Sequence, residues 1–244
     1  MKRKERHHLK ENELVHLFES LRDTWETRQR EIGIAAMVLV VAVAAGIGIA
    51  ALRQREQSQG TALLAEARVV LSTPVTPAGA TTDASELPLF ATAEGFPSDE
   101  ARLRAAVPKL QEAADTYPNS RAGIEARYYL GGALTGLGRY DEAVQAFDEV
   151  VRRAGADSLY GRMARLGRAG ALADAGQLDE AVAAWTELST LGEAYPPDAV
   201  LMGLARAHAA RGDTEQARQT LTEIIDRYPD SPYTLEAREE LDTL

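Results

Sequence analysis

Apolar residues recur at helical spacing along most of the chain, and one stretch is apolar on every side. Residues 32–52 read IGIAAMVLVVAVAAGIGIAAL and contain no charged or strongly polar side chain. As a helix these 21 residues span about 31 Å, which matches the hydrocarbon core of a bilayer. A buried helix of a soluble domain rarely lacks charge over such a length. The pattern therefore predicts a single transmembrane helix at residues 32–52.

The position of this stretch favours a permanent anchor over a cleaved signal peptide. Signal peptides usually have an apolar segment of about 7–15 residues behind a short basic segment. Here the apolar run is longer, and 31 residues precede it. We therefore expect an uncleaved signal-anchor.

Lysine and arginine are unevenly distributed around the predicted span, which indicates its orientation. The 20 residues that follow it hold Arg53, Arg55 and Arg68. The preceding tail holds eight such residues, namely Lys2, Arg3, Lys4, Arg6, Lys10, Arg22, Arg28 and Arg30. We expect residues 1–31 to be cytoplasmic and the C-terminal part to be extracytoplasmic. In a bacterium this means the inner membrane and the periplasm.

A second apolar pattern precedes the span. Leu14, Leu17, Phe18, Leu21 and Trp25 fall on one face of a helix. Such a helix either rests in the membrane interface, with its tryptophan near the headgroups, or offers a docking face to a partner. The sequence leaves both interpretations open.

The C-terminal half contains an internal repeat. Its marker glycines, Gly138, Gly176 and Gly212, are spaced 38 and 36 residues apart. An alanine follows each glycine by five residues, and a bulky residue follows that alanine by four. The three segments are LGGALTGLGRYDEAVQAFDEV from Leu130, RAGALADAGQLDEAVAAWTEL from Arg168 and LARAHAARGDTEQARQTLTEI from Leu204.

This pattern resembles the tetratricopeptide repeat, a helix-turn-helix unit of about 34 residues. In that family a Leu-Gly pair is followed by a large residue, an alanine, an aromatic residue and a proline. The matching residues are Leu130, Gly131, Leu134, Ala143 and Phe147 in the first repeat, Leu172, Ala181 and Trp185 in the second, and Leu204, Ala205, Ala217, Leu221 and Pro229 in the third. The resemblance covers residues 99–244 and implies an all-α solenoid, a right-handed superhelix of helix pairs.

Glycines inside the predicted helices need an explanation, because each is less favourable than alanine by about 0.5–1 kcal/mol. We interpret Gly131 as the point where the two helices of one repeat cross closely. Gly138 ends the first helix and supplies a positive φ for the turn. Gly136 is expected to face solvent.

Pairs of carboxylates follow the marker glycines, and two readings compete for them. They are either an acid/base pair or residues of a helix start, where negative charge interacts favourably with the helix dipole. We favour the second reading for Asp141 with Glu142, Asp179 with Glu180, and Asp213 with Glu215.

Two pieces separate the span from the repeats. Residues 53–72 place Leu64, Ala67 and Leu71 on one helical face, which predicts the first helix of an opening repeat. Residues 73–98 hold four prolines and many small polar residues, which predicts a long flexible loop.

Composition narrows the function. The formal net charge of −10 argues against nucleic acid as a partner. With no cysteine in the 244 residues, disulfides and thiolate sites are excluded. The chain has four histidines, of which His208 is expected to pack in the repeat core, and it lacks the common catalytic and metal-binding motifs. We therefore expect no enzyme, no cofactor and no metal ion.

The resemblance also implies a binding surface. Tetratricopeptide arrays commonly bind proteins on a concave face lined by the first helix of each repeat. Carried over by position, this face comprises Glu125, Tyr128, Met163, Leu166, Met202 and Arg206. Met163, Leu166 and Met202 are expected to be exposed, unless the loop or the helix at residues 53–72 covers them.

A short charged tail, one span and an outer repeat domain together resemble the ancillary SecYEG translocon subunit family. This resemblance implies an adaptor that meets the Sec translocon and periplasmic chaperones. The alternative is a scaffold for another envelope assembly, secretion or cell-division complex, because the ends TYPNS and RYPDS resemble repeats of outer-membrane assembly lipoproteins and cell-division coordinators.

Overall fold

The computed structural model describes residues 3–76 and 95–244, with the backbone alone for residues 3–29 and Ile32. The chain divides into two compact units, Met1–Arg55 and Glu56–Leu244, and each is described by itself. Throughout the described ranges the structure is helical apart from turns and one isolated β-bridge. The expectation of an all-α chain is confirmed.

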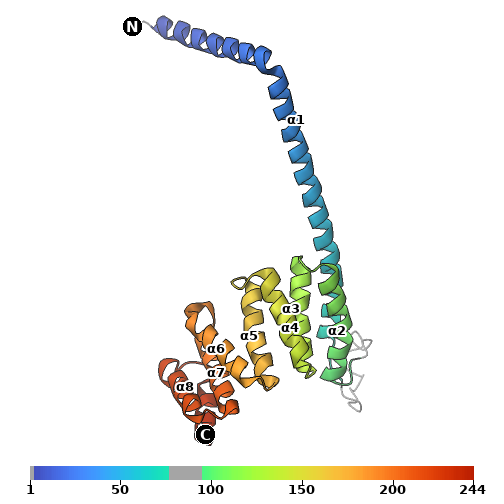
Figure 1. Ribbon diagram of the computed structural model, residues 1–244, viewed down its shortest axis with the longest axis vertical. Helices are drawn as coiled ribbons and strands as arrows, with labels where there is room; N and C mark the ends of the chain where they lie inside the picture. The colour runs from blue at the N-terminus through green and yellow to red at the C-terminus, as the bar shows by residue number, and fades with distance from the viewer. Residues whose placement is uncertain (1–2, 77–94) are drawn as a thin grey trace, which may run out of the picture. The chain divides into compact units, whose positions relative to one another are not determined.

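The first unit consists of the N-terminal part of helix α1, which runs from Arg3 to Ser72 (Figure 1). Every described side chain between residues 30 and 55 is exposed, including large apolar residues from Ile34 to Leu52. The described helix Gly33–Ser72 is long enough to cross a membrane and, with a mean hydropathy of 2.7 in its most apolar window, apolar enough. The predicted stripe of Leu14, Leu17, Phe18, Leu21 and Trp25 lies outside the residues whose side chains are described.

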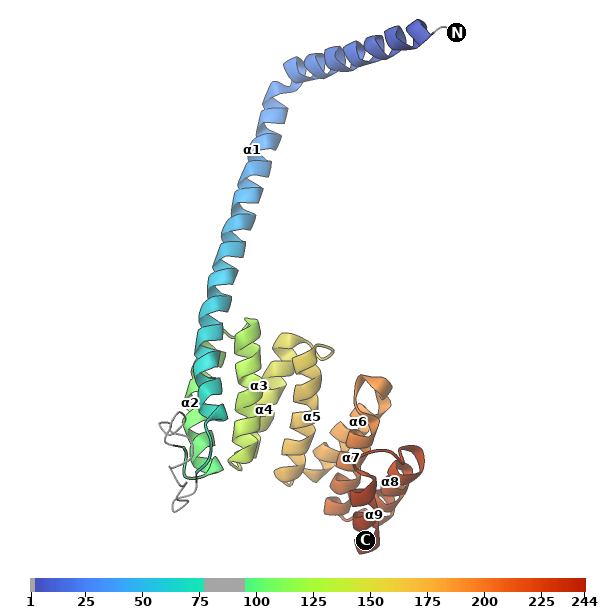
Figure 2. The same cartoon turned by 180° about the vertical axis from the view of Figure 1, so that it is seen from behind.

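The second unit is an array of helix pairs (Figures 1 and 2). We call the leading members first helices and their mates second helices. The first helices are residues 56–72 of α1, α3 (Arg121–Gly136), α5 (Leu159–Asp174) and α7 (Pro197–Arg211). The second helices are α2 (Asp99–Thr116), α4 (Tyr140–Ala154), α6 (Leu178–Thr190) and α8 (Thr214–Arg227). A 3₁₀ turn, Gly192–Ala194, precedes α7, and α9 (Thr234–Thr243) follows α8.

Direct packing joins α3 to α5 and α5 to α7, so the first helices form one continuous layer. Residues 56–72 lie beside α3 in this layer, because Arg68 pairs with Glu125 and an added Cβ at Gly60 would lie 3.4 Å from Cβ of Ala122.

One core cluster extends from Leu64 without a break to Ala171 in α5. From α5 onwards the core divides into three smaller clusters, which contain Leu172, Tyr195 and Met202, respectively.

The marker glycines end the first helices as predicted. Gly138, Gly176 and Gly212 adopt φ values of 72°, 74° and 89°, a region that favours glycine because it has no Cβ. Acidic residues then fall in the first turn of each following helix, such as Asp141 and Glu142 in α4. The interpretation of these carboxylates as helix-start residues is confirmed.

The close crossing predicted at Gly131 is also confirmed. A Cβ at Gly131 would lie 2.7 Å from Cε1 of Phe147 on α4, and a Cβ at Gly167 on α5 would lie 2.6 Å from Cζ of the same ring. The Phe147 ring is therefore held between two glycine surfaces of successive first helices. Trp185 on α6 lies against Gly203 of α7 in the same way.

One glycine expectation needs correction. Gly136 is exposed, but an added Cβ there would lie 2.7 Å from Cδ1 of Leu103, because α2 packs beside the end of α3. The glycine of α3 that faces open space is Gly132, where an added Cβ would meet nothing within 4 Å.

Backbone hydrogen bonds join the two ends of the proline-rich segment. The Thr76 N–H donates to the Phe96 carbonyl (2.9 Å) and the Phe96 N–H donates to the Pro74 carbonyl (3.0 Å), which forms a parallel bridge between Val75 and Phe96. The flexibility predicted for residues 73–98 concerns mainly residues 77–94, which lie outside the described residues.

Candidate protein-binding surfaces

The six predicted binding residues do not form one exposed face. Glu125 is buried beneath Arg68, and Met202 is buried with only 1% of its surface exposed. Tyr128, Met163 and Leu166 are half-buried. Arg206 is exposed but forms ion pairs with Glu236 and Glu240 of α9.

The expectation that Met202 is exposed is wrong, and neighbouring repeats explain why. Tyr128, Leu166 and Met202 occupy equivalent positions, and this position faces the following helix pair. Met202 packs in the cluster that contains Ala237 of α9, and Leu166 packs against the cluster of Tyr195 and Val200. The covering elements are therefore later helices rather than the proline-rich loop or the helix at residues 53–72.

A cluster of tyrosines does lie on the first-helix layer. The Tyr128 ring lies 5.6 Å from Tyr129 and 5.8 Å from Tyr160, measured between ring centroids, in tilted arrangements. The Arg68 guanidinium stands 5.6 Å from the Tyr129 centroid, within cation–π range, and pairs with Glu125. We call Arg68, Tyr128, Tyr129 and Tyr160 the tyrosine patch.

The tyrosine patch includes groups from three first helices, namely α1, α3 and α5. Burial raises the pKa of the Tyr128 phenol above its ordinary value, and the neighbouring Tyr129 raises it further. Burial also raises the pKa of Tyr160, an effect that Tyr129 strengthens and that the Arg68 and Arg121 guanidiniums oppose. The Tyr128 and Tyr160 phenols are therefore neutral hydrogen-bonding groups near pH 7, and the half-buried rings of all three tyrosines offer aromatic contact area.

Sequence reasoning found Tyr128 and Glu125 but missed Arg68, Tyr129 and Tyr160. The adjacent pair Tyr128-Tyr129 could have indicated Tyr129, because neighbouring residues of a helix present their side chains to two adjoining surfaces. Tyr160 gave none, because its equivalent position in α3 is the buried Ala122.

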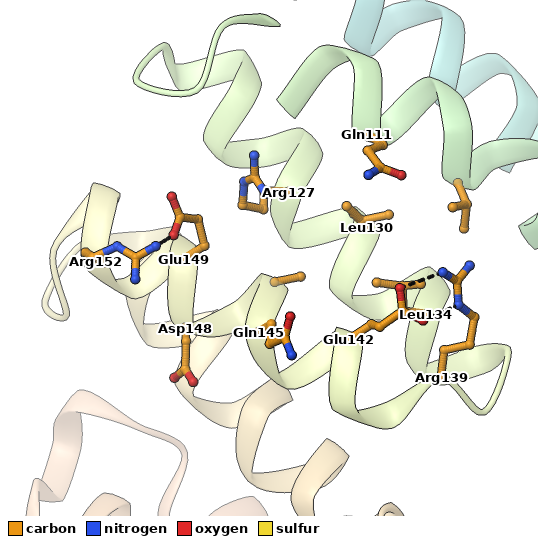
Figure 3. Close-up of a pocket in the computed structure, with 12 residues that line it drawn as sticks. Gln111, Arg127, Leu130, Leu134, Arg139, Glu142, Gln145, Asp148, Glu149 and Arg152 are labelled. Carbon is orange, nitrogen blue, oxygen red and sulfur yellow. Dashed lines mark hydrogen bonds and ion pairs between the residues drawn. The ribbon is translucent and has the colours of Figure 1, made fainter. Parts of the chain in front are cut away.

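The opposite side of the array carries a groove that the sequence did not predict (Figure 3). It lies between α2 and α4, with a volume of about 500 Å³. Leu130 and Leu134 of α3 line it together with Gln111 of α2 and Gln145 of α4. Its charged groups are paired, as in Arg139 with Glu142 and Arg152 with Glu149.

Similar grooves follow along the array. One of about 480 Å³ lies between α4 and α6, and another of about 280 Å³ lies between α6 and α8. Second helices are thus separated by grooves, whereas first helices pack on one another. This difference makes the first-helix layer the inner face of the array and the grooved side its outer face.

No group of three or more potential metal ligands occurs in the part of the chain that the structure describes. The His208 ring is largely buried, and its Nδ1 lies 3.2 Å from Oδ2 of Asp213 at the turn into α8. This pairing explains a histidine within a packed repeat.

Comparison with known sequences identifies the repeats. Residues 99–158 and residues 199–231 each match a family described as Tetratricopeptide repeat. The chain therefore carries tetratricopeptide repeats, which are protein-interaction modules. No curated protein matches the chain.

A solved structure shares the fold of the repeats. A kinesin light chain of Podosopora anserina with nearly identical TPR-like repeats is 19% identical, with 57% of this chain and 76% of that chain covered and a TM-score of 0.51. MamA from Desulfovibrio magneticus RS-1, from residue 41 to its end, is 22% identical, with 57% and 72% covered and a TM-score of 0.47.

Proposed function

We propose that this chain is a membrane-anchored adaptor that binds other proteins through its tetratricopeptide repeats. The observation that carries the proposal is the tyrosine patch on the inner face of the repeat array. Half-buried aromatic rings beside an arginine are the side chains that most often dominate protein interfaces. Repeat arrays of this kind use extended surfaces to hold partners.

Anchoring in the membrane is the second element of the proposal. Residues 32–52 have a length and an apolar composition suited to a bilayer, and their described side chains are exposed. The excess of lysine and arginine before this stretch supports a cytoplasmic N-terminus in the inner membrane. The repeats then lie on the extracytoplasmic side, in the periplasm of a bacterium.

The partner is proposed from architecture. Tail, span and outer repeat domain resemble the ancillary SecYEG translocon subunits, which supports a place at the Sec translocon with periplasmic chaperones as partners. The alternative is a scaffold for another envelope assembly, secretion or cell-division complex, supported by the ends "TYPNS" and "RYPDS".

The orientation predicts a protease result. Protease added to spheroplasts of a bacterial host should degrade residues 53–244, because they lie outside, and should leave the tail of residues 1–31 intact. Antibodies against a tag at each end would report the two fragments. Protection of the C-terminal tag until detergent is added would reverse the proposed topology.

Protein binding is tested by photocrosslinking in intact membranes. A photoreactive benzoylphenylalanine replaces Gly132, which is open and lies one helical turn from Tyr128 and Tyr129 on the inner face. The matched position is Gln145 in the outer groove. We expect the Gly132 variant to form an adduct with a defined protein, identified by mass spectrometry, and the Gln145 variant to form none.

The identity of the crosslinked protein decides between the two settings, the Sec translocon with periplasmic chaperones and another envelope complex. A Sec translocon subunit or a periplasmic chaperone supports the first setting, and another envelope protein supports the alternative. Adducts at Gln145 alone would move the binding site to the outer face. Absence of adducts at both positions would contradict the adaptor proposal.

A further inference from the structure

Two turns at one end of the repeat array lie beside the point where α1 enters it. The turn before α3 is next to α1, because an added Cβ at Gly60 would lie 3.2 Å from Oγ of Ser120. The turn before α5 adjoins the turn before α3, since the Arg153 guanidinium donates to Oδ1 of Asn119 (2.7 Å). Both turns lie at the same end of their helices (Figure 1). We call residues 117–123 and 152–162 the basic edge.

The basic edge differs in charge from the unit that carries it. Its 18 residues contain four arginines and one aspartate, whereas residues 56–244 contain 30 aspartates and glutamates against 17 lysines and arginines. The later turns between helix pairs do not share this excess. Residues 190–198 hold two acidic residues and no basic one, and residues 227–233 hold one of each. The turns with net positive charge are therefore the two nearest to the entry of α1.

The arginines of the basic edge are accessible to a ligand. Arg152 and Arg153 share one carboxylate, that of Glu149, so one of their two positive charges is not neutralised. The Arg152 side chain is 70% exposed, whereas the Glu149 side chain is only 12% exposed. Arg121 is the first residue of α3 and is exposed, as is Asp157, the one acidic residue of the edge. An approaching anionic surface therefore meets more guanidinium groups than carboxylates.

An apolar side chain stands at the same edge. Leu159 takes the place in α5 that Arg121 takes in α3, directly after the N-cap serine, and it is 60% exposed. One exposed leucine is common on protein surfaces. Beside guanidinium groups, however, it suits the surface of an anionic bilayer, where arginines interact with phosphates and apolar side chains reach the acyl boundary.

The predicted span keeps the basic edge within reach of lipid. Gly60 follows Leu52, the last residue of that span, by eight residues. A chain of this length extends at most about 29 Å, however the two units are arranged. Such a tether raises the effective concentration of the bilayer at the edge, so a few weak contacts are enough to hold the two together.

We propose that the basic edge binds anionic phospholipid headgroups of the membrane in which the chain is anchored, with Arg121 and Arg152 at the phosphates and Leu159 at the acyl boundary. This inference rests on the membrane anchor of the proposed function and adds a second contact with the same bilayer. An acidic protein would also suit the arginines. The bilayer is favoured because the span of the same chain holds it nearby.

The test uses the absence of cysteine from the natural chain. Leu159→Cys then carries a single NBD fluorophore on the full chain in nanodiscs. One kind of disc holds phosphatidylcholine alone, and in the other a third of the lipid is phosphatidylglycerol. Both kinds carry spin-labelled headgroups that quench nearby NBD. We expect about threefold stronger quenching of the Leu159 probe in the discs with phosphatidylglycerol.

Matched variants locate the contact. A probe at Leu235→Cys replaces a similarly exposed leucine of α9 and should be quenched equally in both kinds of disc. Arg121→Gln with Arg152→Gln leaves Glu149 paired with Arg153 and should remove more than half of the extra quenching of the Leu159 probe. The control pair, Arg218→Gln with Arg238→Gln, removes two exposed arginines from α8 and α9 and should leave that quenching unchanged.

Equal quenching of the Leu159 probe in the two kinds of disc, or no effect of the Arg121 and Arg152 changes, would overturn the inference. Size-exclusion chromatography of the same samples separates this failure from that of the proposed function. A chain that elutes with the discs but shows no difference in quenching keeps its anchor and lacks the surface contact. A chain that elutes apart from the discs would contradict both.

Discussion

Replacement of Gly131 by leucine should destabilise the repeat unit by about 3 kcal/mol, because the helix crossing has no space for a side chain. The first added carbon would lie 2.7 Å from the Phe147 ring. The ring cannot retreat, since Gly167 of the next first helix closes its other side within a similar distance. Thermal melting of the full chain in detergent, monitored by circular dichroism, measures the loss of stability as a lower melting midpoint.

The matched control is Gly132→Leu, one residue further along α3. A side chain there enters open space, so the melting midpoint should remain close to that of the natural chain. Replacement of Gly132 by alanine should raise stability by up to about 1 kcal/mol, because the unfolded chain loses freedom. Equal midpoints for Gly131→Leu and the natural chain would contradict the crossing at Phe147.

Removal of the Arg68 side chain should destabilise the unit by about 2 kcal/mol, the second largest effect expected. Arg68→Ala removes the ion-pair partner of the Glu125 carboxylate, whose side chain is only 9% exposed in the natural chain. An isolated buried charge is costly, and a loss of about 3–5 kcal/mol is typical when a fully buried pair is broken. The value here is smaller because the Arg68 side chain is half exposed. Urea denaturation at pH 7 measures the loss.

Two further variants test this explanation. Arg68→Ala combined with Glu125→Gln should regain at least half of the lost stability, because a neutral amide is easier to bury than a carboxylate. Arg104→Ala breaks an exposed pair with Glu100 on α2 and should change stability by less than about 0.5 kcal/mol.

The effect of Arg68→Ala should also depend on pH. The Arg68 guanidinium favours the charged form of the Glu125 carboxyl group, so the interaction that Arg68→Ala removes exists only while that carboxyl group is charged. The deficit is then fully present at neutral pH and shrinks as the pH falls towards the acid range in which glutamate takes up its proton. A deficit that is the same at neutral and acid pH would point to lost packing instead.

The helices, their turns and the close crossing were predictable because each follows from local constraints. Positive φ at Gly138 requires a residue without Cβ, and acidic residues at a helix start interact favourably with the helix dipole. The pairing of Gly131 with Phe147 follows from their spacing within one repeat, which the two helices of that repeat bring together.

The binding face was less predictable, because it depends on contacts between repeats. Helical spacing placed Met202 and Arg206 on a common face, but it could not show that α9 covers the first and pairs with the second. Similarly, Gly136 was expected to face solvent. Its neighbour in space, Leu103, belongs to another helix pair, so no local pattern indicated the contact. The direction in which successive pairs stack decides such contacts, and no local pattern encodes it.

The uneven division of the core has a mechanical consequence. One cluster packs the helices together from Leu64 to Ala171, whereas three smaller clusters, two of which begin in α5, hold the helices that follow. In a repeat array each unit is supported mainly by its neighbours, so cooperativity follows the continuity of this packing. A pulling force applied at the tyrosine patch therefore acts on the helices of the large cluster, which we expect to unfold cooperatively. We expect the C-terminal helix pairs to unfold and refold independently of that section, so they deform more readily under load.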